Sequence, residues 1–177
     1  MSYSGGHILI GSQREGHVSQ FPAWVMLVVP LASILFQVYV PLFFQFLSFL
    51  EMPLLVVVYF ALMRRSQVGG LLVGALVGLA QDSLSKNPLG MLGIVNTLVG
   101  YFAASVGLRL DVDQPLIRLL LTFFFFLFHQ LFYWLMVRAL LGQQLAFEVQ
   151  RTLVLGLLNA IVGISLYHFL DKLRKAT

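Results

Sequence analysis

The chain alternates between long apolar runs and short polar breaks. Six apolar runs can be drawn, at about 22–40, 53–63, 68–80, 88–108, 115–141 and 152–170. Most of them approach the roughly 20 residues with which an α-helix crosses about 30 Å of hydrocarbon. The pattern predicts an all-α integral membrane protein with six transmembrane helices and short connections.

The second run is shorter than the others. Pro53 suits the first position of a helix, and Arg64 and Arg65 follow the apolar end of the run. A helix over 53–63 reaches only ~17–18 Å at about 1.5 Å per residue. Part of the apolar segment 41–50 must therefore help to cross the bilayer or lie in its interface, and the sequence leaves both open.

The composition supports a single membrane domain. Hydrophobic residues make up 59% of the chain and charged residues 10%, whereas soluble domains carry about 25% charge. No hydrophilic stretch is long enough for a second domain. We expect a polar tail at 1–21, one six-helix domain at 22–171 and a basic tail at 172–177. The first tail lacks the apolar core and cleavage site of a signal peptide.

Lysine and arginine positions predict the orientation. With six spans both termini share one side, and that side receives eight basic residues: Arg14, Arg64, Arg65, Arg109, Arg118, Lys172, Arg174 and Lys175. The other side receives three, namely Lys86, Arg138 and Arg151. The positive-inside rule therefore predicts cytoplasmic N- and C-termini. The formal net charge of +4 is explained by this arrangement, so we expect no nucleic-acid partner.

Glycine recurs at every fourth position of the third run, at Gly70, Gly74 and Gly78. Residues four apart share one helix face, and small residues there let a second helix approach closely, which is a main source of association in lipid. Matching smooth faces are offered by small residues of the fourth and the sixth run, so the third, fourth and sixth helices are expected to form the tight interior: Gly93, Gly100 and Ala104, and Gly156, Ala160 and Gly163. The ridge predicts tight packing within the fold, with a partner-facing surface as the alternative.

Three further candidates are polar residues inside apolar runs, Asn96, His129 and Asn159. Such groups usually pair across helices, at about 0.6–2 kcal/mol each. His129 is also a functional candidate, because ionisable residues inside membranes often bind substrates or relay protons. A relay needs a partner acid, and the first and the third to sixth runs contain no acid in their middle. Structural pairing is therefore the favoured interpretation of His129.

The break after the third run, residues 81–90, predicts a turn at the outer surface. Asp82 is expected to end the helix, and either pins the hairpin of the third and fourth helices or meets a partner. Pro88 is expected in the first turn of the next helix, with Ser85 or Asn87 as its cap. Gly90 completes the Pro-Leu-Gly sequence of the turn.

No enzyme motif is present. The chain has no Gly-x-Ser-x-Gly elbow, no phosphate-binding glycine loop and no paired acids at similar depth. His7, His17, His129 and His168 are scattered over different regions, and Cys is absent, so no metal-ligand spacing occurs. We expect a non-enzymatic protein without cofactor or metal.

The middle of the chain resembles a known family. The segment 51–62 (EMPLLVVVYFAL) is similar to the second helix of the rod shape-determining protein MreD family, although Phe60 stands where that family usually has Trp. The segment 70–82 (GLLVGALVGLAQD) resembles its glycine helix that ends in Asp, and Pro88-Leu89-Gly90 with 99–104 (VGYFAA) resembles its next turn and helix. The ordered set extends over about residues 22–175.

The resemblance implies a scaffold of the bacterial rod-elongation complex, a multi-pass protein of the cytoplasmic (inner) membrane. Its expected partners are MreC by direct contact, with RodA, penicillin-binding protein 2 and MreB in the same complex. The implied fold is similar to the substrate-binding subunits of energy-coupling-factor transporters. A vitamin-binding subunit of that kind is the alternative function. The first run carries only Ala23 and Ala32, however, and not the Ala-x-x-x-Ala pattern with which such subunits dock.

Overall fold

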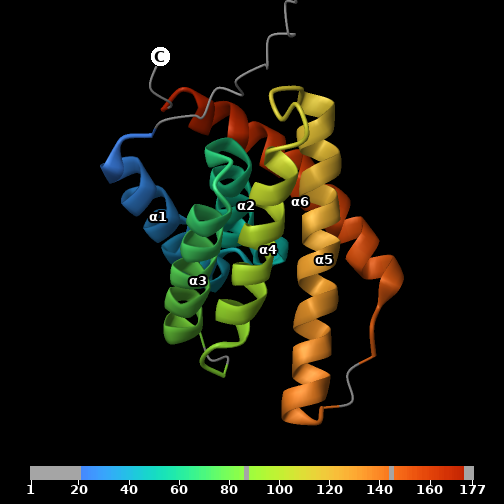
Figure 1. The fold of residues 1–177 in the computed structure, drawn as a ribbon. Helices are drawn as coiled ribbons and strands as arrows, with labels where there is room; N and C mark the ends of the chain where they lie inside the picture. Colours follow the sequence, from blue (N-terminus) through green and yellow to red (C-terminus); the bar gives the residue numbers. More distant parts are fainter. Residues whose placement is uncertain (1–20, 86–87, 144–145, 174–177) are drawn as a thin grey trace, which may run out of the picture.

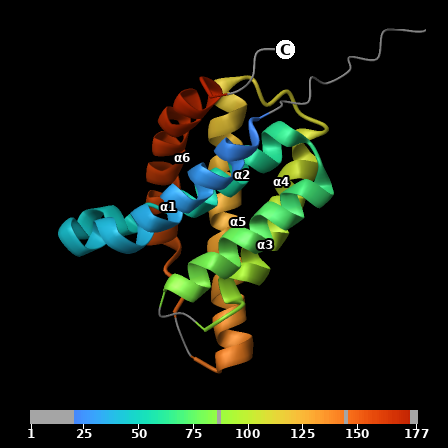
Figure 2. The ribbon, with the colours of Figure 1, turned by 90° about the vertical axis from the view of Figure 1, so that its left-hand side faces the viewer.

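The computed structural model describes residues 21–85, 88–143 and 146–173. This part of the chain is helical, and its elements are α1 (Ala23–Phe43), the 3-10 helix η1 (Gln45–Phe49), α2 (Met52–Arg64), α3 (Gln67–Leu84), α4 (Met91–Gly107), α5 (Pro115–Leu141) and α6 (Val149–Asp171). They form one bundle, in which α5 runs the full height and α6 crosses behind it at an angle (Figure 1). The segment at the end of α1 projects sideways from the bundle (Figure 2).

Five helical segments of the described chain are long and apolar enough to cross a membrane: α1, η1 together with α2, α3, α5 and α6. The remaining helix, α4, has 17 residues and reaches about 25 Å, which is the lower end of the spanning range. The prediction of an all-helical multi-pass membrane protein with six helices is therefore confirmed.

The short helix α2 is the centre of the bundle. Every residue from Pro53 to Met63 is buried, and α2 contacts α1, α3, α4, α5 and α6. A helix that is apolar on all sides suits either a protein interior or the hydrocarbon of a membrane, and here protein covers it. In α1, by contrast, only 22% of the most apolar window is buried. The other helices thus form a wall around α2, and their outer faces carry the exposed apolar side chains.

The segment 41–50 is divided between two elements. The helix α1 continues through Pro41 to Phe43, and η1 occupies Gln45–Phe49. The expected end of the first helix near Val40 was therefore too early. A proline removes one backbone donor, and a membrane helix tolerates this loss when its surroundings satisfy the freed acceptor. Leu42 and Phe43 at the end of α1 are among the most exposed apolar residues.

The helix boundaries near the third and fourth runs also differ from the expectation. The helix α3 continues to Leu84 and not to 80, and α4 begins at Met91 and not at Pro88. The helix α6 begins at Val149, three residues before the expected start, whereas α5 has the expected bounds. The polar residues 81–83 remain helical because two of them are hydrogen-bonded inside the α3–α4 pair, as described below.

The connections lie at two ends of the bundle. The start of α1, the α2–α3 and α4–α5 connections and the end of α6 lie at the upper end in Figure 1, here named the terminal end. The α3–α4 and α5–α6 connections lie at the lower end, here named the distal end. The N-terminus of α2 lies between the two ends, inside the bundle.

Candidate functional site

The glycine ridge of α3 lies directly against α4. A Cβ atom added to Gly70, Gly74 or Gly78 would overlap backbone carbonyl oxygens of α4, and at Gly74 it would overlap that of Asn96. The reverse also holds, because a Cβ at Gly100 would overlap the carbonyl oxygen of Gly70. The two backbones are therefore in van der Waals contact. The ridge is covered by its own chain and offers no surface to an outside helix.

The small residues of α4 extend this contact toward the terminal end. Ala104 is fully buried, and a Cβ at Gly70 would lie 2.9 Å from the Cβ of Ala104. On another face of α4, a Cβ at Gly107 would lie 2.6 Å from the carbonyl oxygen of Leu62 in α2. The helices α2, α3 and α4 therefore form one tightly packed unit. The short distances between these helices are possible only because glycine has no side chain.

Asp82 joins the distal ends of α3 and α4. Its side chain is 1% exposed, and its carboxylate accepts hydrogen bonds from the backbone N–H groups of Gly90 (2.9 Å), Leu92 (3.2 Å) and Gly93 (3.0 Å). The first N–H groups of a helix lack acceptors within the helix, and the positive end of its dipole favours an anion. Of the two roles considered for Asp82, these hydrogen bonds support the pinning of the hairpin.

Two other residues of this turn lie elsewhere than predicted. Pro88 is not in the first turn of α4 but in the preceding turn, where its carbonyl oxygen accepts from the N–H of Met91 (3.4 Å). Ser85 does not cap α4, because its buried Oγ has no hydrogen-bond partner in the described chain. Asn87 lies outside the described residues. Gly90 is the residue before α4, and its φ of 96° is a left-handed conformation that favours glycine.

Replacing Asp82 with asparagine is expected to lower the free energy of unfolding by about 1–3 kcal/mol. Asparagine lacks the negative charge, and its NH2 group cannot accept from the helix N-terminus. Scanning fluorimetry of the purified protein in detergent would measure the change. The matched control is Asp111→Asn, in an exposed residue between α4 and α5. Equal melting temperatures for the Asp82 variant and the wild type would refute the assigned role.

The buried polar residue Asn96 also links α3 with α4. It is fully buried, and its amide Nδ2 donates to Oε1 of Gln81 at 3.4 Å. Its Oδ1 has no hydrogen-bond partner in the described chain. Asn96 thus pairs across the two helices through its NH2 group, and its side-chain carbonyl oxygen does not take part.

Asn159 of α6 supports the N-terminus of α2 inside the bundle. Its Oδ1 accepts from the backbone N–H of Glu51 (2.8 Å), and its Nδ2 donates to the carbonyl oxygen of Phe49 (2.9 Å). On the other side, Oε1 of Gln37 in α1 accepts from the N–H of Met52 (3.2 Å). Backbone groups away from water need partners within the protein. Side chains from α1 and α6 therefore allow α2 to begin at mid-depth.

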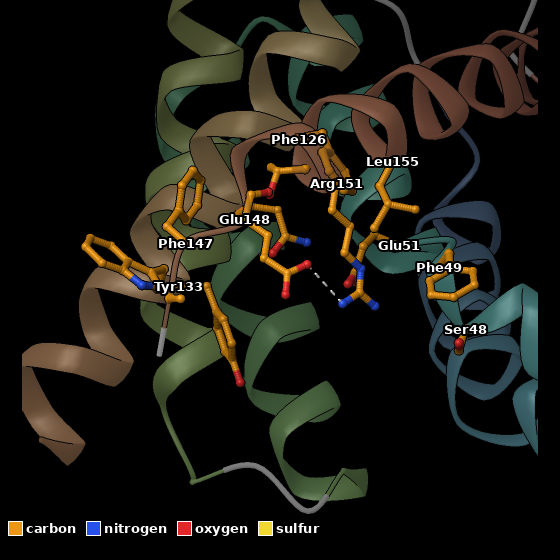
Figure 3. Close-up of a pocket in the computed structure, with 13 residues that line it drawn as sticks. Ser48, Phe49, Glu51, Phe126, Tyr133, Phe147, Glu148, Arg151 and Leu155 are labelled. Carbon is orange, nitrogen blue, oxygen red and sulfur yellow. Dashed lines mark hydrogen bonds and ion pairs between the residues drawn. The ribbon is translucent and has the colours of Figure 1, made fainter. Parts of the chain in front are cut away.

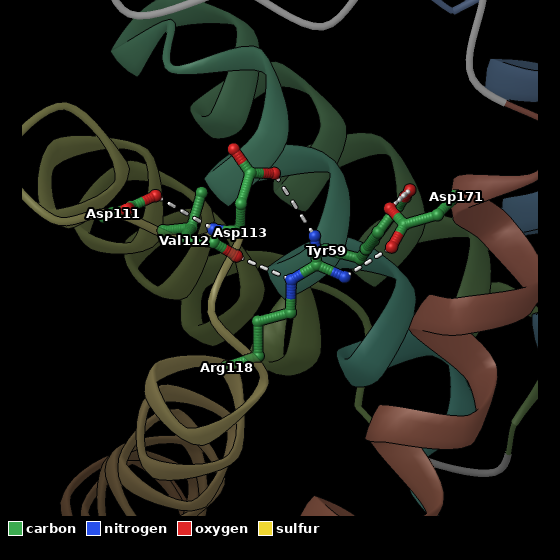
Figure 4. Close-up of polar contacts among 6 residues, drawn as sticks. All are labelled: Tyr59, Asp111, Val112, Asp113, Arg118 and Asp171. Atoms are coloured by element: carbon green, nitrogen blue, oxygen red, sulfur yellow. Dashed lines mark hydrogen bonds and ion pairs between the residues drawn. The ribbon is translucent and has the colours of Figure 1, made fainter.

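An ionic cluster around the buried Arg118 closes the terminal end, and it was not predicted from the sequence. Arg118 of α5 is 8% exposed and forms an ion pair with Asp171 at the end of α6 (Figure 4). Its Nε donates to the carbonyl oxygen of Val112 (2.6 Å), and its second terminal nitrogen lies 3.5 Å from Asp113. The hydroxyl of Tyr59 in α2 donates to Asp171 at 2.8 Å.

The sequence contained a signal for this cluster. Arg118 lies one turn inside α5, which begins at Pro115, and such a position is deeper than a charge that merely flanks a span. Asp171 is the acid at the corresponding end of the last run. Arg118 was assigned only to the positive-inside count, and its ion pair with Asp171 was therefore not predicted.

Two adjoining cavities lie beside the N-terminus of α2. The larger is about 490 Å³ and lies among α1, α3, α4 and α5. The smaller is about 360 Å³ and lies among η1, α5 and the start of α6; Figure 3 shows Glu148 and Tyr133 across it from Phe49. Glu51, Gln130 and Tyr133 line both cavities. The described chain holds no group of three or more His, Asp or Glu residues able to hold a metal ion.

His129 lines the larger cavity. It is 3% exposed, and its Nδ1 is buried without a hydrogen-bond partner in the described chain. Cross-helix pairing, the interpretation favoured from the sequence, therefore has no contact to support it. Glu51 precedes the second apolar run, and it lines the same cavity as His129. The fold thus brings an imidazole and a carboxylate to one space.

The whole bundle falls within one known family. The family model of the rod shape-determining protein MreD matches residues 19–176. No curated protein and no solved structure matches the chain. The match includes α1 to α6, and with them the glycine ridge, Asp82 and both cavities. The resemblance seen in the sequence is therefore confirmed, and the chain belongs to the rod shape-determining protein MreD family.

Proposed function

We propose that this protein is a non-enzymatic scaffold of the bacterial rod-elongation complex in the inner membrane. Membership of the MreD family establishes a role in rod shape determination. The structural observation that carries the scaffold proposal is the backbone contact of α3 with α4 around the buried α2. Such a core holds the outer helices in fixed positions, as a docking surface for other membrane proteins requires.

The proposed orientation has both termini in the cytoplasm, with the tails 1–21 and 172–177 on that side. Among the described residues, Arg64, Arg65 and Arg109 lie at the terminal end, whereas Arg138 and Arg151 lie toward the distal end. The excess of basic residues at the terminal end supports this orientation. We also keep the expectation that the six-helix arrangement is similar to that of energy-coupling-factor substrate-binding subunits.

The proposed direct partner is MreC, with RodA, penicillin-binding protein 2 and MreB in the same complex. Because α4 covers the glycine ridge, the single membrane helix of MreC would have to bind an outer face. The exposed apolar residues of α1, α5 and α6 provide such faces. A vitamin-binding transporter subunit is not part of the proposal, because the family match concerns shape determination.

The test combines depletion with site-specific crosslinking in the native bacterium. Depletion of the protein is expected to convert rods to spheres. A photo-crosslinking amino acid at the exposed positions Leu31 in α1, Phe124 in α5 and Leu157 in α6 is expected to capture MreC from at least one face. The matched control is the buried Val57 in α2, which should give no adduct. Rods that persist after depletion would refute the role, and no MreC adduct at any exposed position would refute direct contact.

A further inference from the structure

The two cavities beside α2 contain polar groups that lack partners within the described chain. The Glu51 carboxylate forms no ion pair or hydrogen bond there, and neither does the Gln130 amide. His129 adds a buried Nδ1 that has no hydrogen-bond partner among the described residues. Of these groups only the His129 Nδ1 is fully buried, whereas the Glu51 and Gln130 side chains are partly exposed to the cavity space. Polar groups in such a space are stabilised by a partner that supplies hydrogen bonds in place of lost water. These groups therefore point to an occupant that supplies hydrogen bonds.

The charges around the cavities indicate what kind of occupant fits. Among the described residues, the larger cavity is lined by one acid, Glu51, and by no Lys or Arg. In the smaller cavity Glu148 and Arg151 lie 3.5 Å apart and pair with each other, so Glu51 has no ion-pair partner among the described residues (Figure 3). An ionised carboxylate in a region of low dielectric strongly favours a nearby cation. The space is thus suited to a positively charged group.

We propose that this cavity pair binds a protonated primary amine, carried either by a small polar molecule or by a phospholipid headgroup. An ammonium group has three donors and no acceptor, which matches the acceptor-only Glu51 carboxylate. The amide oxygen of Gln130 and an acceptor nitrogen of the neutral His129 ring can receive the other donors. Cavities of about 300–1,000 Å³ are typical of sites for small ligands, and both cavities are in this range.

The first arm of the test uses a free amine and the full-length protein purified in detergent. Ethanolamine is titrated by calorimetry, with ethylene glycol as the matched compound that lacks the ammonium group. Ethanolamine should bind the wild type and ethylene glycol should not. Glu51→Gln is expected to raise the Kd at least about tenfold, because a charge-assisted hydrogen bond is lost.

The second arm places the protein in nanodiscs of phosphatidylethanolamine or phosphatidylcholine, which differ in the N–H donors of the headgroup. Native mass spectrometry then counts the lipids retained after transfer to detergent. If the protein retains phosphatidylethanolamine, Glu51→Gln abolishes this retention and free ethanolamine does not bind, the amine belongs to a lipid headgroup. Ethanolamine binding with equal retention of both lipids identifies a small molecule.

Two further variants make the outcome decisive. Asp111→Asn is the same chemical change at an exposed residue that lines neither cavity, and should change the Kd less than about twofold. Gln130→Leu leaves the carboxylate in place and should weaken amine binding, which keeps the test valid if Glu51→Gln fails to fold. The proposal is overturned if neither arm shows a preference for amines, or if Glu51→Gln and Gln130→Leu both retain that preference.

Discussion

Replacing Gly74 with leucine is expected to destabilise the bundle by about 3 kcal/mol or more, the largest effect of any substitution considered. Even the first carbon of the new side chain would overlap the carbonyl oxygen of Asn96, which is backbone and cannot rotate away. The helices α3 and α4 would have to separate, and the contacts of α4 with α2 would be lost as well. The hydrogen bonds of Asp82 to α4 depend on the same separation.

Thermal unfolding in detergent, followed by the fluorescence of Trp24 and Trp134, would measure this effect. Gly74→Ala should lie between the wild type and Gly74→Leu, because only one carbon must be accommodated. Leu76→Phe adds bulk at a position of α3 that is 69% exposed, and should leave the melting temperature unchanged. A Gly74→Leu protein as stable as its Leu76→Phe counterpart would disprove the contact of α3 with α4.

Replacing Asp171 with leucine is expected to destabilise the bundle by about 2–4 kcal/mol, because Arg118 would keep its buried charge without its closest counter-ion. The effect should be smaller than that of breaking a fully buried pair, since the Asp171 side chain is 29% exposed and Asp113 remains 3.5 Å away. Tyr59 would also lose the acceptor of its hydroxyl group.

A double substitution separates the ion pair from general packing. Arg118→Met combined with Asp171→Leu should be more stable than Asp171→Leu alone, because no buried charge is left without a counter-ion. The carboxylate of Asp113, the other partner of Arg118, is 58% exposed and stays hydrated. Arg151→Met serves as the control, since Arg151 and Glu148 form an exposed pair and such pairs contribute about 0–1 kcal/mol. Strictly additive effects of the two substitutions, measured from the same melting curves, would rule out the coupling of Arg118 with Asp171.

The spans could be predicted from the sequence wherever the apolar pattern acts alone. The bounds of α5 agree with the pattern because Pro115 begins the run and Gly142 follows its end in a left-handed conformation. The end of α3 could not be predicted in this way. By its local chemistry Asp82 favours a helix end. It nevertheless stays in α3, because its carboxylate oxygens accept hydrogen bonds from the backbone N–H groups at the N-terminus of α4.

The candidate site was predictable in parts. The spacing of the glycines predicted a close helix contact, and small residues in the fourth and sixth runs offered two helices for it. The structure selects α4, whereas Gly156 and Gly163 of α6 face side chains of α5 and α2. The shared cavity wall was not predictable, because Glu51 and Gln130 are far apart in the chain and meet only after α2 and α5 have packed. Glu51 is a single acid between two apolar segments, and from the sequence alone it indicates only the boundary between two helices.

The enclosure of α2 constrains how this protein is made. Its covering includes α5 and α6, which the ribosome synthesises long after α2 has emerged. Until those later segments enter the bilayer, α2 lies beside lipid or insertion machinery without the side-chain partners that Asn159 and Asp171 later provide. Maturation of the bundle therefore cannot proceed strictly from the first segment to the last, and must await the synthesis and insertion of α5 and α6. Truncation within the final segment should accordingly leave an immature product that quality-control proteases remove.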